Sequence, residues 1–240
     1  MAKPLLERQA SLIEYMTSSA AIFGRGGDLS LVQAIEGIDG PLLRIEAQFS
    51  YAKRMEKITA VLPRTFELLG NAEAELVRAF VESCPPTTIN RLENARQFHR
   101  FLSSHWMRES PNPPYLCDVA ACEIAFAEVD AHAAQPDAAH TPRIGIRRSL
   151  AVVLLRCAYD VRPIFEKGLK QGAPIKLETS LVIALPLGTD RAQVFEVVPA
   201  IFDLLASLDD WTDPKGPGAE PQLAKLLTDL AARGLVEVSQ

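Results

Sequence analysis

Apolar residues recur at steps of three and four through the first 140 positions, the spacing of one face of an α-helix. The clearest stripe follows Pro41, where Leu42, Ile45 and Phe49 share a face. Proline suits the first turn of a helix because its missing N–H has no partner there. Glycines and prolines separate this helix from others at 4–22, 64–69, 71–81, 88–106 and 115–134. The sequence therefore predicts a helical bundle over residues 1–140.

Beyond residue 140 the pattern changes to short apolar and alternating runs. Residues 134–142 are rich in alanine and proline and predict a linker. The predicted strands are 149–155, 176–187 and 194–198, with helices at 161–168, 199–208 and 223–233, and residues 235–238 could close the sheet. This order favours a small winged-helix-like domain with a three-stranded sheet over residues 141–240. The expected fold class is α+β.

Composition describes an ordinary globular protein. The 240 residues are 48% hydrophobic and have a formal net charge of −5, which disfavours general nucleic-acid binding because phosphate contacts need a basic surface. No apolar run approaches the roughly 18 residues that span a bilayer. Glu7, Arg8 and Glu14 interrupt any signal-peptide core, and four cysteines are too few for a disulfide scaffold. We expect a cytoplasmic protein without membrane contact.

Charge is unevenly distributed in the second part of the chain. Residues 143–176 hold eight basic and two acidic side chains, a net charge of +6, whereas residues 190–240 have a net charge of −5. The basic stretch favours either a docking surface for an acidic partner or simply solvated faces of strands and a helix.

Catalytic and metal-binding motifs are missing from the sequence. The four cysteines form no C-x-x-C and the four histidines no i, i+4 pair. Asp118 and Cys122 lie four apart, which is half a metal site at best. There is no G-x-S-x-G, P-loop or G-x-G-x-x-G, and the glycines at 24–27 are read as a turn. We expect no catalytic residue, no metal site and no cofactor in this chain.

Glu123 falls on the apolar line of the helix 115–134. A buried carboxylate is costly unless it is paired, so we interpret Glu123 as half of a salt bridge. Arg54 and Arg64, on either side of the break before Pro63, are its candidate partners.

The winged-helix-like domain is a poor match to DNA. Its last helix carries only Lys225 and Arg233 against Asp229, too little positive charge for a recognition helix. Binding an extended peptide by strand addition suits the domain better. The second and third strands and the following helix supply the expected peptide-binding residues, Leu181, Ile183, Val194, Phe195, Val197 and Phe202.

Four blocks together resemble a known family. They are Tyr51-x-x-Arg54, VLPRTFELLG at 61–70, PPYLCDVAACEIA at 113–125 and IRRSLAVVLLRCAYDVRPIF at 146–165. In order and spacing they are similar to the MbnC/BufC/HvfC/TglI-like partner proteins of multinuclear iron enzymes in peptide natural-product pathways. The resemblance covers roughly residues 1–210.

The resemblance implies a helical N-terminal domain and a C-terminal domain like a RiPP recognition element, which binds a leader peptide. It implies two partners, an MbnB-type enzyme that holds the iron and a ribosomal MbnA-type precursor whose cysteines become oxazolone and thioamide groups. The expected docking residues, Arg54, Arg64, Arg147 and Arg148, are not transferred from a family motif.

Two other functions stay open. A DNA-binding regulator would bind DNA in a salt-dependent way, and a stand-alone enzyme would turn over substrate without a partner. The function favoured here, a non-catalytic subunit that recruits a peptide to an iron oxygenase, predicts co-purification with that enzyme.

Overall fold

The computed structural model describes residues 5–24, 39–134, 145–169, 172–212 and 221–239. The chain is a mixed α+β protein, and its contacts divide it into two compact units, Met1–Ser110 and Pro111–Gln240. The second unit begins earlier than the predicted domain boundary at residue 140, because helix α8 (Leu116–Ala133) packs on the sheet of that unit. Most of the predicted linker, residues 135–142, lies outside the described residues.

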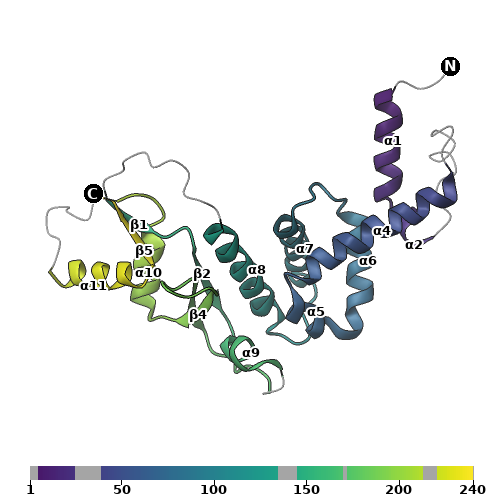
Figure 1. Ribbon diagram of the computed structural model, residues 1–240. Helices are drawn as coiled ribbons and strands as arrows, with labels where there is room; N and C mark the ends of the chain where they lie inside the picture. The colour runs from purple at the N-terminus through teal and green to yellow at the C-terminus, as the bar shows by residue number, and fades with distance from the viewer. Residues whose placement is uncertain (1–4, 25–38, 135–144, 170–171, 213–220, 240) are drawn as a thin grey trace. The chain divides into compact units, whose positions relative to one another are not determined.

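The first unit is helical (Figure 1). Its described elements are α1 (Leu5–Thr17), α2 (Ser19–Phe23), α4 (Gly40–Thr59), α5 (Pro63–Leu69), the 3₁₀ turn η1 (Gly70–Ala72), α6 (Glu73–Ser83) and α7 (Arg91–Trp106). The predicted single helix 4–22 is broken at Ser18, whose hydroxyl accepts the N–H of Ala21 at 3.2 Å and so caps α2. In the same way Asp39 caps α4, accepting the N–H of Leu42 at 3.3 Å.

Aromatic side chains form the centre of this unit. The ring centroids of Phe66 and Phe98 lie 5.3 Å apart, and those of Phe80 and Phe98 lie 4.9 Å apart. Leu62 and Leu102 are fully buried beside them. Burying such side chains contributes about 1.5–3 kcal/mol each, which fixes α5, α6 and α7 against one another.

The second unit combines helices with two small sheets. After α8 come β1 (Gly145–Arg148), β2 (Val152–Cys157), α9 (Arg162–Lys167), β3 (Thr179–Ala184), β4 (Gln193–Glu196), α10 (Pro199–Ser207), α11 (Pro221–Ala232) and β5 (Val236–Ser239). Strands β2, β3 and β4 form an antiparallel sheet in that order. The prediction that residues 235–238 close this sheet is wrong, because β5 pairs with β1 in a separate two-stranded sheet.

Helices cover both faces of the three-stranded sheet. On one face Val152, Val182 and Ala184 pack with Leu205 of α10 and Leu227 of α11 into a buried core. The alternate residues of β2 and β3 point to the opposite face of the sheet. Helix α8 covers that face, as its contacts with β2 and β3 show. The sheet therefore offers partners its edges rather than its faces.

The described helices include none that is long and apolar enough to cross a membrane.

Candidate functional site

Strand β4 is an open edge of the three-stranded sheet. Among the described residues it is hydrogen-bonded to a strand on one side only, β3. The N–H of Val197 donates to the carbonyl of Ser180 at 2.9 Å, so alternate residues, Val197 and Phe195, direct their backbone groups toward β3. Val194 and Glu196 consequently direct their N–H and C=O groups outward. A second chain could pair with these groups.

Apolar side chains flank this edge. Phe195 is 38% exposed and Val198, which starts the turn into α10, is 63% exposed. The register of Phe195 with Val182 places its side chain on the α10 face of the sheet. Edge strand β2 differs, because most of its side chains are partly or fully buried. Val198 was not among the predicted peptide-binding residues. The available signal was its position, an apolar residue at the end of a strand and directly before Pro199.

Only part of the predicted peptide-binding set is accessible. Val194 and Val197 are partly buried and Phe195 is exposed. Leu181 and Ile183 are fully buried on the face that α8 covers, and Phe202 is 8% exposed. These three side chains support the edge from inside, so we do not keep them as peptide contacts. Apolar runs cannot distinguish a side chain that holds a strand from one that faces a ligand.

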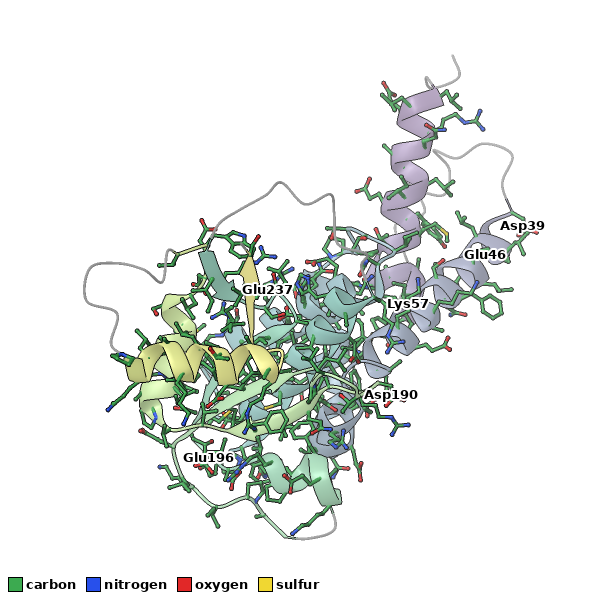
Figure 2. All side chains as sticks on the ribbon, turned by 60° about the vertical axis from the view of Figure 1, so that its left-hand side comes forward. Asp39, Glu46, Lys57, Asp190, Glu196 and Glu237 are labelled. Atoms are coloured by element: carbon green, nitrogen blue, oxygen red, sulfur yellow. The ribbon has the colours of Figure 1, made fainter. Side chains whose placement is uncertain are left out.

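Glu196 is fixed at the edge by a neighbouring helix. Its carboxylate forms a 2.6 Å ion pair with Arg162 of α9, which also donates two hydrogen bonds to Asp160, at 2.8 and 2.9 Å. These hydrogen bonds lower the pKa of Asp160 below its ordinary range. Figure 2 shows Glu196 on β4. The side chain is thereby held while its backbone groups stay free for pairing.

The basic stretch is paired within its own unit. Arg147 forms a 2.6 Å ion pair with Glu237, and Arg148 pairs with Asp209 and donates to the carbonyl of Leu205 at 3.2 Å. The guanidinium of Arg147 also lies 4.8 Å from the centre of the Trp211 ring. Side-chain exposures of 19% and 23% leave little of these two arginines for a partner.

More exposed arginines follow the same rule, since Arg156 pairs with Asp203 at 2.7 Å. Four arginines of the segment 143–176, namely Arg147, Arg148, Arg156 and Arg162, therefore form ion pairs with carboxylates of the segment 190–240. Neither reading of the sequence, a docking surface or solvated faces, anticipated this. We do not keep Arg147 and Arg148 in the docking surface.

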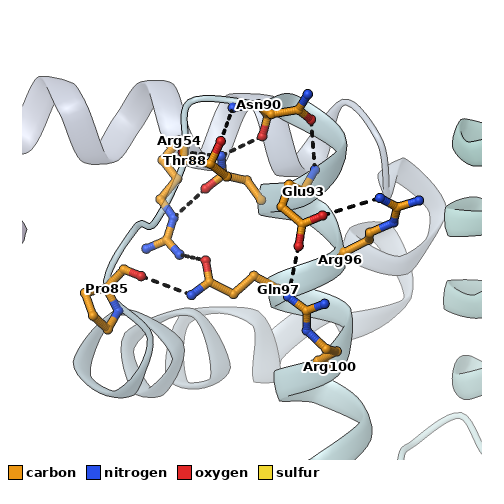
Figure 3. A network of polar contacts seen from close by, with 9 residues as sticks. Arg54, Pro85, Thr88, Asn90, Glu93, Arg96, Gln97 and Arg100 are labelled. Carbon is orange, nitrogen blue, oxygen red and sulfur yellow. Dashed lines mark hydrogen bonds and ion pairs between the residues drawn. The ribbon is translucent and has the colours of Figure 1, made fainter. Parts of the chain in front are cut away.

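Arg54 occupies the centre of a polar network in the first unit (Figure 3). Its guanidinium donates to Oδ1 of Asn94 at 3.0 Å, to the carbonyl of Cys84 at 2.9 Å and to Oε1 of Gln97 at 2.8 Å. It also lies 4.5 Å from the centre of the Phe80 ring. Arg54 is only 8% exposed, and burial lowers its pKa. It therefore joins α4 to α7 and to the connection before α7, and it is not an exposed docking residue.

The acceptors of Arg54 are themselves held in place. The Asn94 amide donates to the carbonyls of Thr88 and Asn90, at 2.9 and 2.7 Å, and the Gln97 amide donates to the carbonyl of Pro85 at 3.0 Å. Figure 3 shows Glu93 turned to the other side of α7, where Arg96 and Arg100 neutralise it. Arg64, at the start of α5, is partly buried and stays a prediction for docking.

Two thiols meet in the second unit. Cys122 of α8 and Cys157 of β2 are both buried. A hydrogen bond with Cys157, together with burial, raises the pKa of Cys122 well above its ordinary value. A buried thiol with a raised pKa, such as that of Cys122, is a poor nucleophile. In the described part of the chain no group of three or more His, Cys, Asp or Glu side chains is arranged to hold a metal ion.

Comparison with known proteins gives no assignment. No family model matches the chain, and no curated protein matches it.

Proposed function

We propose that this protein is a non-catalytic subunit that recruits a ribosomally made precursor peptide to a multinuclear iron enzyme of the MbnB type. In this proposal the enzyme holds the iron and modifies cysteines of an MbnA-type precursor to oxazolone and thioamide groups. The observation that carries the proposal is the open β4 edge with its exposed apolar flank.

The β4 edge has what strand addition requires. Val194 and Glu196 offer two outward N–H and two outward C=O groups, so an extended peptide gains backbone hydrogen bonds whatever its sequence. Phe195 and Val198 offer apolar contact to alternate side chains of that peptide. Backbone pairing supplies affinity, and the apolar contacts supply selectivity.

The order of elements also supports a RiPP-recognition-like domain. Three consecutive antiparallel strands, β2, β3 and β4, are followed by two helices, α10 and α11, that pack on the same core. This is the arrangement expected for a winged-helix-like peptide-recognition domain. The β1–β5 sheet and helix α8 are additions to it.

A tagged pull-down from cells that express the neighbouring genes tests the subunit role. The expected result is an iron-containing partner at about one to one, with the precursor peptide in the complex. A chain that elutes alone and free of iron would contradict the proposal. Salt-dependent binding to DNA by the isolated chain would favour the regulator instead.

The β4 edge is tested with the precursor peptide from that operon and the variant Val194→Pro. Proline removes one outward N–H and is tolerated on the open side of an edge strand. Peptide affinity is expected to fall about tenfold or more, as the loss of one paired group and steric block predict. The matched control is Arg156→Pro in β2, the other edge strand. If Arg156→Pro lost peptide affinity and Val194→Pro did not, the peptide would be assigned to β2.

A further inference from the structure

The first unit contains an apolar groove distinct from the β4 edge. It lies between α1, α2, α4 and the connection from α6 to α7, and has a volume of about 460 Å³. Its apolar lining comes from four elements of the unit: Leu12, Ile13, Met16, Ile22, Val81 and Ile89. This size and lining are typical of a binding site for apolar groups.

Among the described residues, every charged side chain that lines the groove is basic. They are Lys53, Arg54 and Lys57. The guanidinium of Arg54 donates to neutral oxygens of Asn94, Cys84 and Gln97, and the ammonium of Lys57 donates to the carbonyl of Ile89 at 3.0 Å. Within the described residues no carboxylate forms an ion pair with any of these three cations.

A buried cation without a carboxylate partner is unusual, because removing a charge from water is costly unless it is paired. Arg54 is such a cation at the base of the groove. A carboxylate arriving in the groove would offset this cost. Figure 2 shows Asp39 and Glu46 at the N-terminal side of α4, away from Lys57. Glu56, next to Lys57, is exposed but does not line the groove.

Tyr51 also lines the groove. Burial, followed by the nearby Glu73 carboxylate, raises the pKa of Tyr51. The phenol therefore stays protonated and adds no negative charge to the groove wall.

The apolar surface extends beyond the groove. Ile89 and Ile13, on its two sides, are 88% and 64% exposed, and Leu5 and Leu6 farther along α1 are more than 70% exposed. The 13 residues of α1 span about 20 Å, more than a small ligand covers. Figure 1 shows α1 projecting from the other helices of its unit, and its main contacts are with α2 and α4.

We propose that this groove is a docking site for an acidic amphipathic helix of a protein partner. Apolar side chains of that helix would enter between Ile13 and Ile89, and its flanking carboxylates would meet Lys53 and Lys57. Binding of an apolar helix face in such a groove is a general recognition mode. The groove is independent of the β4 edge. An enzyme partner that binds in the groove would need an amphipathic helix with acidic flanks.

Two labelled synthetic peptides of about 18 residues test this, each with the same apolar stripe at helical spacing. One has glutamates beside the stripe and the other has lysines. Fluorescence anisotropy with the full chain is expected to show that the glutamate peptide binds at least about tenfold more tightly, a difference of about 1.4 kcal/mol.

Variants on the groove provide the controls. Ile89→Asp and Ile13→Asp change exposed side chains and so leave the core intact, and each is expected to weaken the glutamate peptide about tenfold. Lys53→Glu is expected to reduce the preference for the glutamate peptide, because it lowers the positive charge of the groove lining. Met107→Asp is the matched control, because Met107 is 82% exposed in the same unit but does not line the groove.

Equal affinity for both peptides, or equal weakening by Met107→Asp, would overturn the proposal. Binding of dodecanoate without binding of either peptide would also overturn it and assign the groove to a small apolar acid. Val194→Pro is expected to leave the glutamate peptide unaffected, so a failure here and a failure of the β4 edge are distinguishable.

Discussion

Arg147 and Glu237 face each other across the β1–β5 sheet and form a 2.6 Å ion pair. The two residues are directly opposite in the register, so a hydrogen-bonded charge pair joins β1 and β5 on one face of the small sheet. The indole of Trp211 packs against the guanidinium. A pair that looked like an interface charge in the sequence is therefore a contact within one domain.

Reversing one of these charges is expected to destabilise the second unit. Arg147→Glu sets two carboxylates side by side and should lower the free energy of unfolding by about 1–2 kcal/mol, since the pair is partly exposed and screened. Urea denaturation measures this. The exchange of both residues, Arg147→Glu with Glu237→Arg, should recover at least half of the loss. No recovery would mean that packing on Trp211, and not charge, is what Arg147 contributes.

Prolines in β4 and just after it should act differently at Val194 and Val197. Val197→Pro removes the N–H that donates to Ser180 and should lower the unfolding free energy by about 1–3 kcal/mol, because the Ser180 carbonyl loses its partner. Val194→Pro removes an outward N–H and should cost less than about 1 kcal/mol. Thermal unfolding of both variants measures the difference. Equal destabilisation would show that the direction assigned to the backbone groups of β4 is incorrect.

Gly145 has no room for a side chain. Its φ of +141° is rarely adopted by other residues, and a Cβ would lie 2.7 Å from the carbonyl oxygen of Thr212. Gly145→Ala should destabilise the unit by about 2–4 kcal/mol through backbone strain and displacement of that carbonyl. Gly168→Ala is the control, because its φ is +83° but the space around it is open, so only a backbone strain of about 1–3 kcal/mol applies, without displacement of a neighbour. Chemical denaturation compares the two.

The pH dependence of stability should depend on Asp160. Hydrogen bonds from Arg162 lower its pKa below the ordinary 3.8, so the carboxylate stabilises the fold above pH 3.8. That stability is lost as the pH falls from 3.8 through the lower pKa of the folded state. Asp160→Asn should therefore lose less stability than the parent over this acidic range in urea titrations at successive pH values.

Asp118 provides a control of opposite sign. Burial raises its pKa above 3.8, so protonation favours the folded state as the pH falls through that higher value toward 3.8. Asp118→Asn should remove this gain, while its amide oxygen can still accept the N–H of Tyr159, as Asp118 does at 2.9 Å. Identical pH profiles for the two variants would contradict both assignments.

Helices were easier to predict from the sequence than the contacts of charged residues. The stripe after Pro41 gave α4, and the run 176–187 gave β3, because periodicity and proline position act locally. The same local signals placed β4 and α10 to within two residues. The pairing of β5 with β1 could not be predicted in this way, because a four-residue strand carries no information about its distant partner.

The candidate site was predictable in outline and not in detail. The third strand was expected as a binding edge, but the outward direction of Val194 and Glu196 depends on hydrogen-bond parity, which only the register with β3 fixes. Arg54 was expected near a break in the helices, yet its burial depends on acceptors more than 30 residues away in sequence. The spacing of residues along the sequence does not show which distant residues come into contact in the fold.

The β1–β5 sheet also has a consequence for the time order of folding. Arg147 and Glu237 are 90 positions apart, a long-range pairing that raises the contact order of the second unit and slows its folding. During synthesis, β1 leaves the ribosome well before β5 exists. At that stage the three-stranded sheet can already form, but Arg147 and the edge of β1 that pairs with β5 still lack their partner. A chain that stops short of residue 236 therefore keeps the backbone contacts of β1 with Thr212 and Leu208 but lacks the β5 strand that completes its sheet.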